Sequence, residues 1–289
     1  MLNSTIFNKD YINKNGVWFP KDSEEKVSTA FSDDTSALNY MVEDASWWFS
    51  YRMENLLVLA EKYFDKDTLI VDIGGGNGYS CKIFQQNNYK TLLIEPSVGG
   101  CLNAAKRGLK EVVCDVVTDD SIQDNSLCQV VLLDVLEHIE DDKSMLKLLH
   151  KKLTPNGKII LTVPAFNALW SSEDDGAGHF RRYTHKQIVR LFKEVGFSVN
   201  YSTYMFDFLI LPVYFIRHLG EKVGLIKPVN QRTKEEEKKL KEKEFVAPKG
   251  IVGAVLNFFE KLETNRIKKG RSSWIGTSVV VVASKKNIF

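Results

Sequence analysis

The stretch of sequence that decides the fold runs from Val71 to Gly78 and reads VDIGGGNG. It joins a short apolar run to glycines at alternating positions, and an amphipathic segment follows it. Glycine has no Cβ, so its backbone can turn tightly and let a ligand approach closely. By itself such a turn is a weak signal, because a purely structural strand-to-helix turn can have the same composition.

On both sides of this turn, short apolar runs alternate with segments of helical spacing. This alternation predicts a parallel sheet with helices on both faces. We expect strands at 69–73, 91–94, 111–114, 129–133 and 158–163, and helices at 79–86, 98–107, 141–152 and 184–195. After these come a strand at 197–205, a helical region at 206–272 and a final β-branched strand at 278–283.

Carboxylates stand at the ends of the first three predicted strands. Glu95 follows the glycines by about twenty residues, where a nucleoside-binding α/β fold places an acid on the ribose hydroxyls. Asp115 ends the third strand, where it can accept from an adenine amino group. Asp72 precedes the glycines and suits an amine-bearing ligand better than a pyrophosphate, which needs only N–H donors.

These residues and the turn LTPNGKII at 153–160 resemble the signature motifs of class I S-adenosylmethionine-dependent methyltransferases. The EHI run at 137–139 is similar to the run after the fourth strand in bacterial small-molecule methyltransferases of the ubiquinone-biosynthesis O-methyltransferase-like group. The resemblance implies a Rossmann-like α/β fold with a seven-stranded, mostly parallel sheet, an antiparallel last strand and a helical insertion before it. It also implies S-adenosyl-L-methionine as cofactor. The implied cofactor-binding residues in this part of the chain are Asp72, Gly74, Gly75, Gly76, Asn77, Glu95, Pro96, Asp115, Val116, Asp134 and Val135.

Residues 47–52, WWFSYR, resemble a run in a bacterial subgroup whose members fold this segment over the cofactor. The resemblance implies that Tyr51 and Arg52 face the methionine carboxylate, to which arginine is suited. The alternative is an aromatic helix start packed on the core. We therefore expect a cap segment at 1–52, a methyltransferase core at 53–205 and 273–289, and a helical insertion at 206–272.

The long loop after the fifth strand is the expected acceptor site, because loops at this face commonly carry function. His179 in this loop is the first candidate for a general base, and His138 is the second. Arg181 and Arg182 could bind a carboxylate or phosphate, unless one of them pairs with an acid at 173–175 to order the loop. The expected substrate contacts are Trp47, Phe166, Trp170, Arg181, Arg182 and Tyr183.

No bound metal is expected, although Asp134, Glu137 and His138 form a run that a metal could use. The net charge of +2 offers little excess for neutralising phosphates, so we expect no nucleic-acid partner. The apolar run at 205–219 is too short for a membrane span. It leaves open a pocket cap, a homodimer face or peripheral membrane contact. Without a secretory signal at the start, we expect a cytoplasmic protein.

The predicted function is methyl transfer from S-adenosylmethionine to a small-molecule acceptor by in-line displacement at the sulfonium methyl. An oxygen nucleophile is favoured. The alternatives are N- or C-methylation of a small molecule and a cofactor-binding regulatory protein without catalysis. A nicotinamide oxidoreductase is disfavoured, because the glycines follow a G-x-G-x-G spacing instead of G-x-G-x-x-G.

Overall fold

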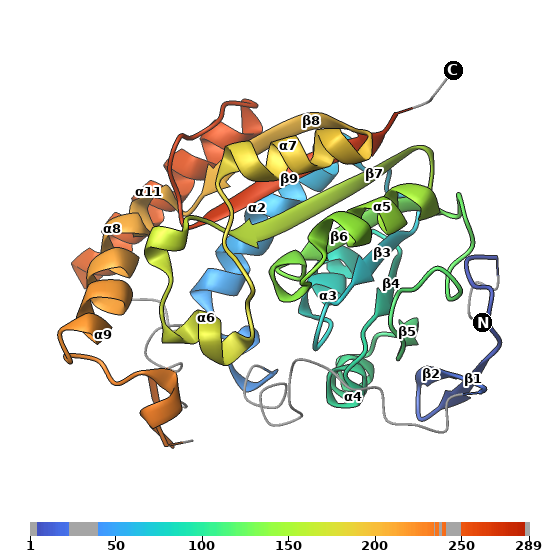
Figure 1. Ribbon diagram of the computed structural model, residues 1–289, viewed down its shortest axis with the longest axis horizontal. Helices are drawn as coiled ribbons and strands as arrows, with labels where there is room; N and C mark the ends of the chain where they lie inside the picture. Colours follow the sequence, from blue (N-terminus) through green and yellow to red (C-terminus); the bar gives the residue numbers. More distant parts are fainter. Residues whose placement is uncertain (1–4, 23–39, 234, 237–238, 241–249, 287–289) are drawn as a thin grey trace.

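A sheet of nine strands runs through the computed structural model, which describes residues 5–22, 40–233, 235–236, 239–240 and 250–286. The strand order is β1-β2-β5-β4-β3-β6-β7-β9-β8 (Figure 1). The five strands from β5 to β7 are parallel, and β9 lies antiparallel between β7 and β8. This confirms the predicted Rossmann-like arrangement. The bounds of these seven strands are β3 Ile70–Ile73, β4 Thr91–Ile94, β5 Val112–Val113, β6 Leu127–Leu133, β7 Leu153–Pro164, β8 Phe197–Met205 and β9 Ser278–Lys285.

An N-terminal hairpin adds two strands, so the expected count of seven is wrong. Its strands are β1 (Tyr11–Lys14) and β2 (Val17–Pro20), and β2 lies parallel to β5 at the edge of the sheet. Asn15 and Gly16 form the turn with φ angles of 57° and 86°. Positive values at both positions are those of a type I′ turn, which matches the twist of the two strands.

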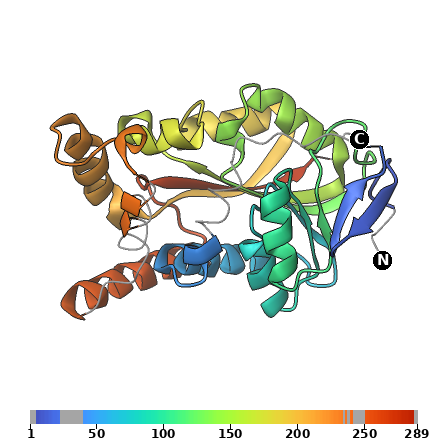
Figure 2. The ribbon, with the colours of Figure 1, turned by 90° about the horizontal axis from the view of Figure 1, so that it is seen from below.

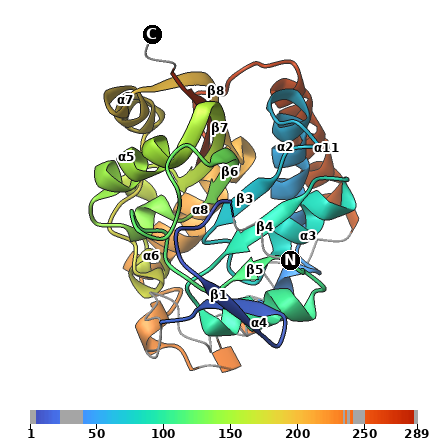
Figure 3. The same cartoon turned by 90° about the vertical axis from the view of Figure 1, so that its right-hand side faces the viewer.

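Two layers of helices enclose the sheet, as the views in Figures 2 and 3 show. Helices α5 and α7 cover one face, and α2, α3 and the C-terminal part of α11 cover the other. Neighbouring residues of β9 pack on opposite faces of the sheet. Val281 packs toward α5 and α7, and Val280 and Val282 pack toward α2. This alternation is the period of two of an extended strand. The helix bounds are α2 Trp47–Tyr63, α3 Tyr79–Gln86, α4 Val98–Lys106, α5 Asp142–Lys152, α6 Ser172–Ala177, α7 His185–Val195 and α11 Gly250–Lys268.

The segment between β8 and β9 is helical, as expected, where the structure describes it. The carboxylate of Glu263 in α11 accepts the backbone N–H groups of Phe206 and Asp207 at 2.8 and 3.0 Å, so the two ends of the segment are joined. No described helix has the length and apolar character to cross a bilayer. The short elements of the segment are η3 Asp207–Leu209, α8 Ile210–Val213, the π-helical turn η4 Tyr214–Leu219, α9 Gly220–Lys222 and η5 Val229–Gln231.

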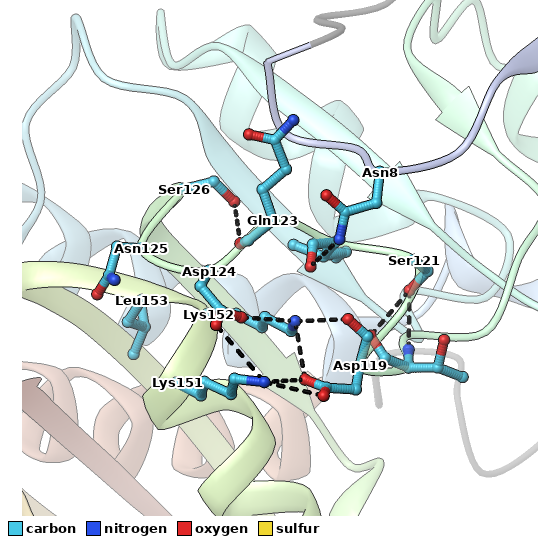
Figure 4. A network of polar contacts seen from close by, with 12 residues as sticks. Asn8, Asp119, Ser121, Gln123, Asp124, Asn125, Ser126, Lys151, Lys152 and Leu153 are labelled. Atoms are coloured by element: carbon cyan, nitrogen blue, oxygen red, sulfur yellow. Dashed lines mark hydrogen bonds and ion pairs between the residues drawn. The ribbon is translucent and has the colours of Figure 1, made fainter.

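A buried lysine ties the end of α5 to the loop before β6 (Figure 4). The side chain of Lys152 is 1% exposed, and its ammonium donates to the Asp119 carbonyl at 2.7 Å and to Asp124 Oδ1 at 2.8 Å. Lys151 beside it is half exposed and pairs with the carboxylate of Asp119. These contacts lie at the amino end of β6, so they stabilise the fold far from the carboxyl ends of the strands.

Candidate active site

The glycine turn at 74–78 connects β3 to α3 and leaves room above its backbone. Gly76 has a φ of +55°, and a Cβ built on it would meet no atom within 4 Å. Gly74 has a φ of +73°, and a Cβ there would lie 2.7 Å from a methyl of Val135. The turn therefore needs glycine both for its backbone angles and for close approach, which fits the cradle that a nucleoside cofactor requires.

Glu95 closes one side of this cradle. Its carboxylate accepts the N–H of Gly76 at 2.9 Å and the N–H of Ser97 at 2.8 Å. Burial raises the pKa of Glu95 above its ordinary value, although both backbone hydrogen bonds oppose the shift. The carboxylate is thus fixed at the end of β4, as the sequence predicts for a group that holds a ribose.

Asp115 follows β5 and is contacted by the N-terminal hairpin. Tyr11 donates its hydroxyl to Asp115 Oδ2 at 2.7 Å, and Lys9 Nζ lies 3.6 Å away. The backbone N–H of Val116 donates to Oδ1 at 2.8 Å, while the side chain of Val116 is exposed. Sequence reasoning missed Tyr11 and Lys9, although the Asn-Gly turn between two short apolar runs is a hairpin signal.

Asp72 lies beneath the glycine turn instead of beside the open cradle. It is fully buried, and its Oδ2 accepts from the hydroxyl of Ser80 and the thiol of Cys81. Burial raises the pKa of Asp72 to about 6. A Cβ on Gly75 would lie 2.5 Å from this carboxylate, so Asp72 and Gly75 fit each other. The expected contact of Asp72 with an amine-bearing ligand is therefore replaced by a role in supporting the turn.

The side chain of Asn77 is also hydrogen-bonded to other side chains of the protein. Its amide donates to Glu43 at 3.0 Å and accepts from Asn103 at 3.0 Å. Arg107 in turn pairs with Glu43 at 2.6 Å, so these side chains connect the turn to the segment before α2. Pro96 follows Glu95 directly, and its carbonyl faces the thiol of Cys114.

Arg52 reaches the carboxyl ends of β6 and β7. Its Nη1 lies 2.9 Å from Asp134 Oδ2, and its Nη2 donates to the hydroxyl of Thr162 at 2.8 Å. Thr162 donates to Asp134 Oδ1 at 2.8 Å and completes a closed triangle of contacts. Arginine and carboxylate are largely buried here, which strengthens their attraction relative to a surface pair.

The side chain of Tyr51 points away from the strand ends, contrary to the expectation that it faces the methionine carboxylate. Its ring packs on Phe206 and Phe208 with centroids 5.4 and 5.9 Å away. Its hydroxyl lies 3.4 Å from the carbonyl of Glu260 in α11. Successive residues of a helix face different directions, so Arg52 turns to the strand ends and Tyr51 turns to α11.

A cavity of about 530 Å³ lies beside Asp134, between the strand ends, α6 and the segment from η3 to η4. Both apolar side chains and ionisable groups line it. The apolar lining residues include Trp47, Trp48, Leu209, Pro212, Val213 and Ile216. The ionisable lining residues include Asp134, Glu137, His138, Asp174, His179, Arg182, Arg217 and Arg232.

His179 is held in this cavity by Asp174. His179 Nδ1 lies 2.8 Å from Asp174 Oδ1, and Arg182 binds the same carboxylate with Nε at 2.7 Å and Nη2 at 2.9 Å. Burial raises the pKa of Asp174, but the hydrogen bonds from His179 and Arg182 outweigh it and the pKa is lowered overall. An ionised carboxylate only accepts, so Nδ1 carries the proton and Nε2 keeps its lone pair.

Glu137 and His138 lie directly beside His179. Both carboxylate oxygens of Glu137 are buried, and neither has a hydrogen-bond donor among the described residues. Burial, and after it the charge of Asp134, raises the pKa of Glu137 well above its ordinary value. The rings of His138 and His179 meet edge to face at 4.6 Å, and burial followed by His179 lowers the pKa of His138 to about 4.

The predicted substrate contacts divide into two groups. Trp47 and Arg182 line the cavity, and Arg182 makes the ion pair with an acid of 173–175 that was the alternative for this loop. The others bind inside the protein. Arg181 and Tyr183 both contact Asp142, Phe166 stacks on Tyr204, and Trp170 donates to Asp175. None of these four side chains lines the cavity beside Asp134.

The structure also specifies contacts that the sequence left open. Asp174 is fixed by the start of α6, where its carboxylate accepts the N–H of Ser171 in a capping box. The cavity wall from Leu209 to Ile216 comes from the insertion. The serine at 171 followed three residues later by an acid is a helix-start signal, but it does not reveal which side chain the acid meets.

A family model described as a methyltransferase domain matches residues 47–202. The chain belongs to the methyltransferase-domain family. Its enzyme class is accordingly S-adenosylmethionine-dependent methyl transfer, with S-adenosyl-L-methionine as the cofactor. The matched residues contain the glycine turn, Glu95, Asp115 and the loop with His179.

Solved structures with the same fold are only distantly related to this methyltransferase. Haemonchus contortus phosphoethanolamine N-methyltransferase 2, in complex with S-adenosyl-L-methionine, has a TM-score of 0.54 at 15% identity. The match covers 93% of this chain but only 62% of that chain. The putative methyltransferase in a complex with the Haloferax volcanii activator Trm112 has a TM-score of 0.55 at 15% identity, covering 89% and 96% of the two chains.

The [4+2]-cyclase SpnF is also similar to this methyltransferase, with a TM-score of 0.54 at 16% identity, covering 88% of this chain and 93% of that one. Likenesses at this level establish the fold and do not identify the acceptor. No curated protein matches the sequence. The ubiquinone-biosynthesis subgroup is therefore not confirmed.

Proposed function

We propose that this methyltransferase methylates an oxygen of a small molecule bound in the cavity beside Asp134. The observation that carries the proposal is the position of His179, a cavity-lining imidazole whose Nδ1 is 2.8 Å from a buried carboxylate. That geometry keeps the second ring nitrogen available to a hydroxyl proton. The cavity volume of about 530 Å³ lies within the range for small-molecule sites.

The cofactor is proposed to lie across the glycine turn. Glu95 would hold the ribose hydroxyls, and the open space above Gly76 would admit the nucleoside. Arg52, at the ends of β6 and β7, would face the methionine carboxylate. The cofactor supplies an activated methyl group, so the chain has to orient the acceptor and remove its proton.

His179 is the proposed base. Its Nδ1–H is bound to Asp174, and Arg182 fixes that carboxylate with two hydrogen bonds. The dyad therefore holds one tautomer and one ring orientation, which is what a positioned base requires. His138 is the less suitable base, because its pKa of about 4 makes its nitrogen a weak proton acceptor.

The mixed lining of the cavity supports an acceptor with both polar and apolar parts. A reacting hydroxyl would lie beside His179, and an apolar part would lie against the insertion side chains from Leu209 to Ile216. In small-molecule sites a few polar groups commonly fix the orientation of an otherwise apolar ligand.

The proposal is tested with His179→Ala and a panel of phenols, alcohols and carboxylic acids, by following the release of S-adenosylhomocysteine. We expect the rate with a hydroxyl acceptor to fall by about 10²- to 10⁴-fold, the usual loss for a general base. Cofactor affinity should not change. The matched control is His185→Ala, because His185 contacts Ser202 in β8 and does not line the cavity.

An unchanged rate in His179→Ala with a hydroxyl acceptor would exclude the histidine as base. Turnover only with amines would replace oxygen by nitrogen as the nucleophile. Tight cofactor binding without methylation of any acceptor would instead favour a regulatory protein that binds S-adenosylmethionine.

A further inference from the structure

Three side chains that line the cavity, those of Glu137, His138 and His179, bring possible ligand atoms together. His179 Nε2 lies 4.0 Å from Glu137 Oε1. Because His179 Nδ1–H is committed to Asp174, Nε2 presents a lone pair, and the carboxylate opposite presents two more acceptors. The ring of His138 completes the group, and one ligand atom from each of the three residues lies within 4.8 Å of the others.

We infer that Glu137, His138 and His179 bind a divalent transition-metal ion. Glu137 is buried, and both its oxygens lack a hydrogen-bond donor among the described residues. A buried carboxylate without a partner is strongly unfavourable, and a cation bound between it and the two imidazoles would supply the partner that Glu137 lacks. Two imidazoles and one carboxylate favour zinc, cobalt, iron, nickel or manganese over magnesium or calcium, which prefer oxygen ligands.

The surroundings of His179 match those of a metal-bound histidine. Such a histidine usually donates its second N–H to a carboxylate, which fixes the ring and raises its basicity. Asp174 is that carboxylate, and Arg182 and the N–H of Ser171 hold it in turn. The backbone supports the cluster as well, since the N–H of Phe180 donates to the carbonyl of Glu137 at 2.8 Å and joins the loop to η1 (Leu136–His138).

The ligand set differs from the one that the sequence suggested. Asp134 was the first residue of the run considered for a metal, but Arg52 and Thr162 bind both of its oxygens. His179 takes its place, although it is 45 residues further along the chain. Two ligands about 2.1 Å from a tetrahedral ion lie about 3.4 Å apart, so binding requires the three side chains to close in slightly.

The ion would face the cavity, because all three ligands line it. Its remaining coordination positions are then open to an oxygen of the acceptor, whose proton a metal makes easier to remove. This catalytic part rests on the proposed function. With the ion bound, His179 Nε2 is a ligand, so the metal would replace the free imidazole in activating the hydroxyl: it would lower the hydroxyl pKa, and the proton would pass to solvent water.

The test uses the full chain, freed of metal with a chelator and titrated with Co²⁺. We expect one ion per chain with visible d–d absorption, and displacement of that absorption by Zn²⁺. Glu137→Gln should abolish it. The matched control is Glu173→Gln, because Glu173 lines the same cavity but pairs with Arg232. Asp174→Asn should weaken Co²⁺ binding by about 10- to 100-fold, the usual effect of losing a carboxylate behind a metal-bound histidine.

No visible absorption in the wild-type chain overturns the site, and so does absorption that survives in Glu137→Gln. Circular dichroism checks that this variant is folded. If it is unfolded, His138→Gln is used instead and should likewise abolish the Co²⁺ absorption. The two proposals fail separately. Methylation of a hydroxyl by chelated protein excludes the metal from catalysis and keeps the proposed function, whereas Co²⁺ absorption without any methylated oxygen keeps the metal site and overturns the proposed function.

Discussion

Glu95 already accepts two backbone N–H groups before a ligand is considered. If it also holds the ribose, Glu95→Ala should weaken binding of S-adenosylhomocysteine by about 1.5–3 kcal/mol, the range for hydrogen bonds to a charged acceptor. Isothermal titration calorimetry measures this, with Glu111→Ala at the start of the next strand as the control. An affinity equal to that of the wild type would remove Glu95 from the cofactor site.

Asp72 should make stability depend on pH in an unusual direction. Its folded pKa is about 6, above the ordinary 3.8, so the folded state binds the proton more tightly than the unfolded state. The stabilisation is complete below about pH 4 and is lost as the pH rises through 6. Two pKa units correspond to about 3 kcal/mol.

Urea unfolding of Asp72→Asn at about pH 4 and pH 7 measures this effect. The asparagine does not titrate, so the wild type should lose about 3 kcal/mol more than the variant between the two pH values. Equal losses in the two proteins would show that the folded pKa of Asp72 is ordinary.

The positions of site residues could be predicted where the local sequence determines them. The glycine turn, Glu95 and Asp115 all stand at strand ends, and strand ends follow from short-range patterns. The partners of Arg181 and Tyr183 could not be predicted, since both meet Asp142 from an element forty residues away. The grouping of Glu137 with His179 could not be predicted for the same reason, because the two residues come from different loops.

At the scale of elements, the insertion is joined to α6 by polar contacts. The guanidinium of Arg232 pairs with Glu173 and lies 3.6 Å from Glu221. Glu221 in turn accepts the N–H and the hydroxyl of Ser172 at 2.9 and 2.7 Å. The cavity wall made by the insertion therefore depends on a few largely buried ion pairs.

Arg232→Met should loosen this junction without unfolding the sheet. Loss of a hydrogen bond to a charged group costs about 1.5–3 kcal/mol, which corresponds to roughly 10- to 100-fold faster local opening. Hydrogen exchange of residues 210–231 measures it, and Lys227→Met is the control because Lys227 pairs with Glu236 in solvent. Similar exchange in the two variants would assign the docking of the insertion to its apolar contacts alone.

The buried ammonium of Lys152 depends on two aspartates in the loop before β6 for its counter-charge. Asp119→Asn with Asp124→Asn leaves the ammonium of Lys152 buried without a counter-charge, so the urea midpoint should fall. Adding Lys152→Met removes the stranded charge and should restore part of the loss. Lys151→Met should have little effect, because Lys151 is half exposed. A further fall in the triple variant would contradict this explanation.

The hairpin at the sheet edge shows why element prediction was incomplete. Its strands have four residues each, too short for a clear alternation, and only the Asn15–Gly16 turn marks it. The seven core strands were easier to predict, because each is bounded by a helix or by turn residues. The expected cap over the cofactor stays a prediction, and residues 23–39 of it lie outside the described part of the chain.

At the scale of the molecule, apolar side chains remain on the outer surface of the insertion. Leu211 of α8 and Phe215 of η4 are more than half exposed, and so are Ile251, Val252 and Phe258 of α11. A protein surface of this composition is more often a contact face than a bare one. The dimer face and the peripheral membrane contact therefore stay predictions, and oligomeric state in solution is the measurement that separates them.

The place of β9 also constrains how the chain can be assembled on the ribosome. This strand lies between β7 and β8 and pairs with both along most of its length. It is synthesised after both of its neighbours, so β8 has no partner in the sheet until Ser278 and the residues after it have emerged. Completion of this half of the sheet must then be a late event during translation, and the nascent chain exposes an edge of β7 until that point.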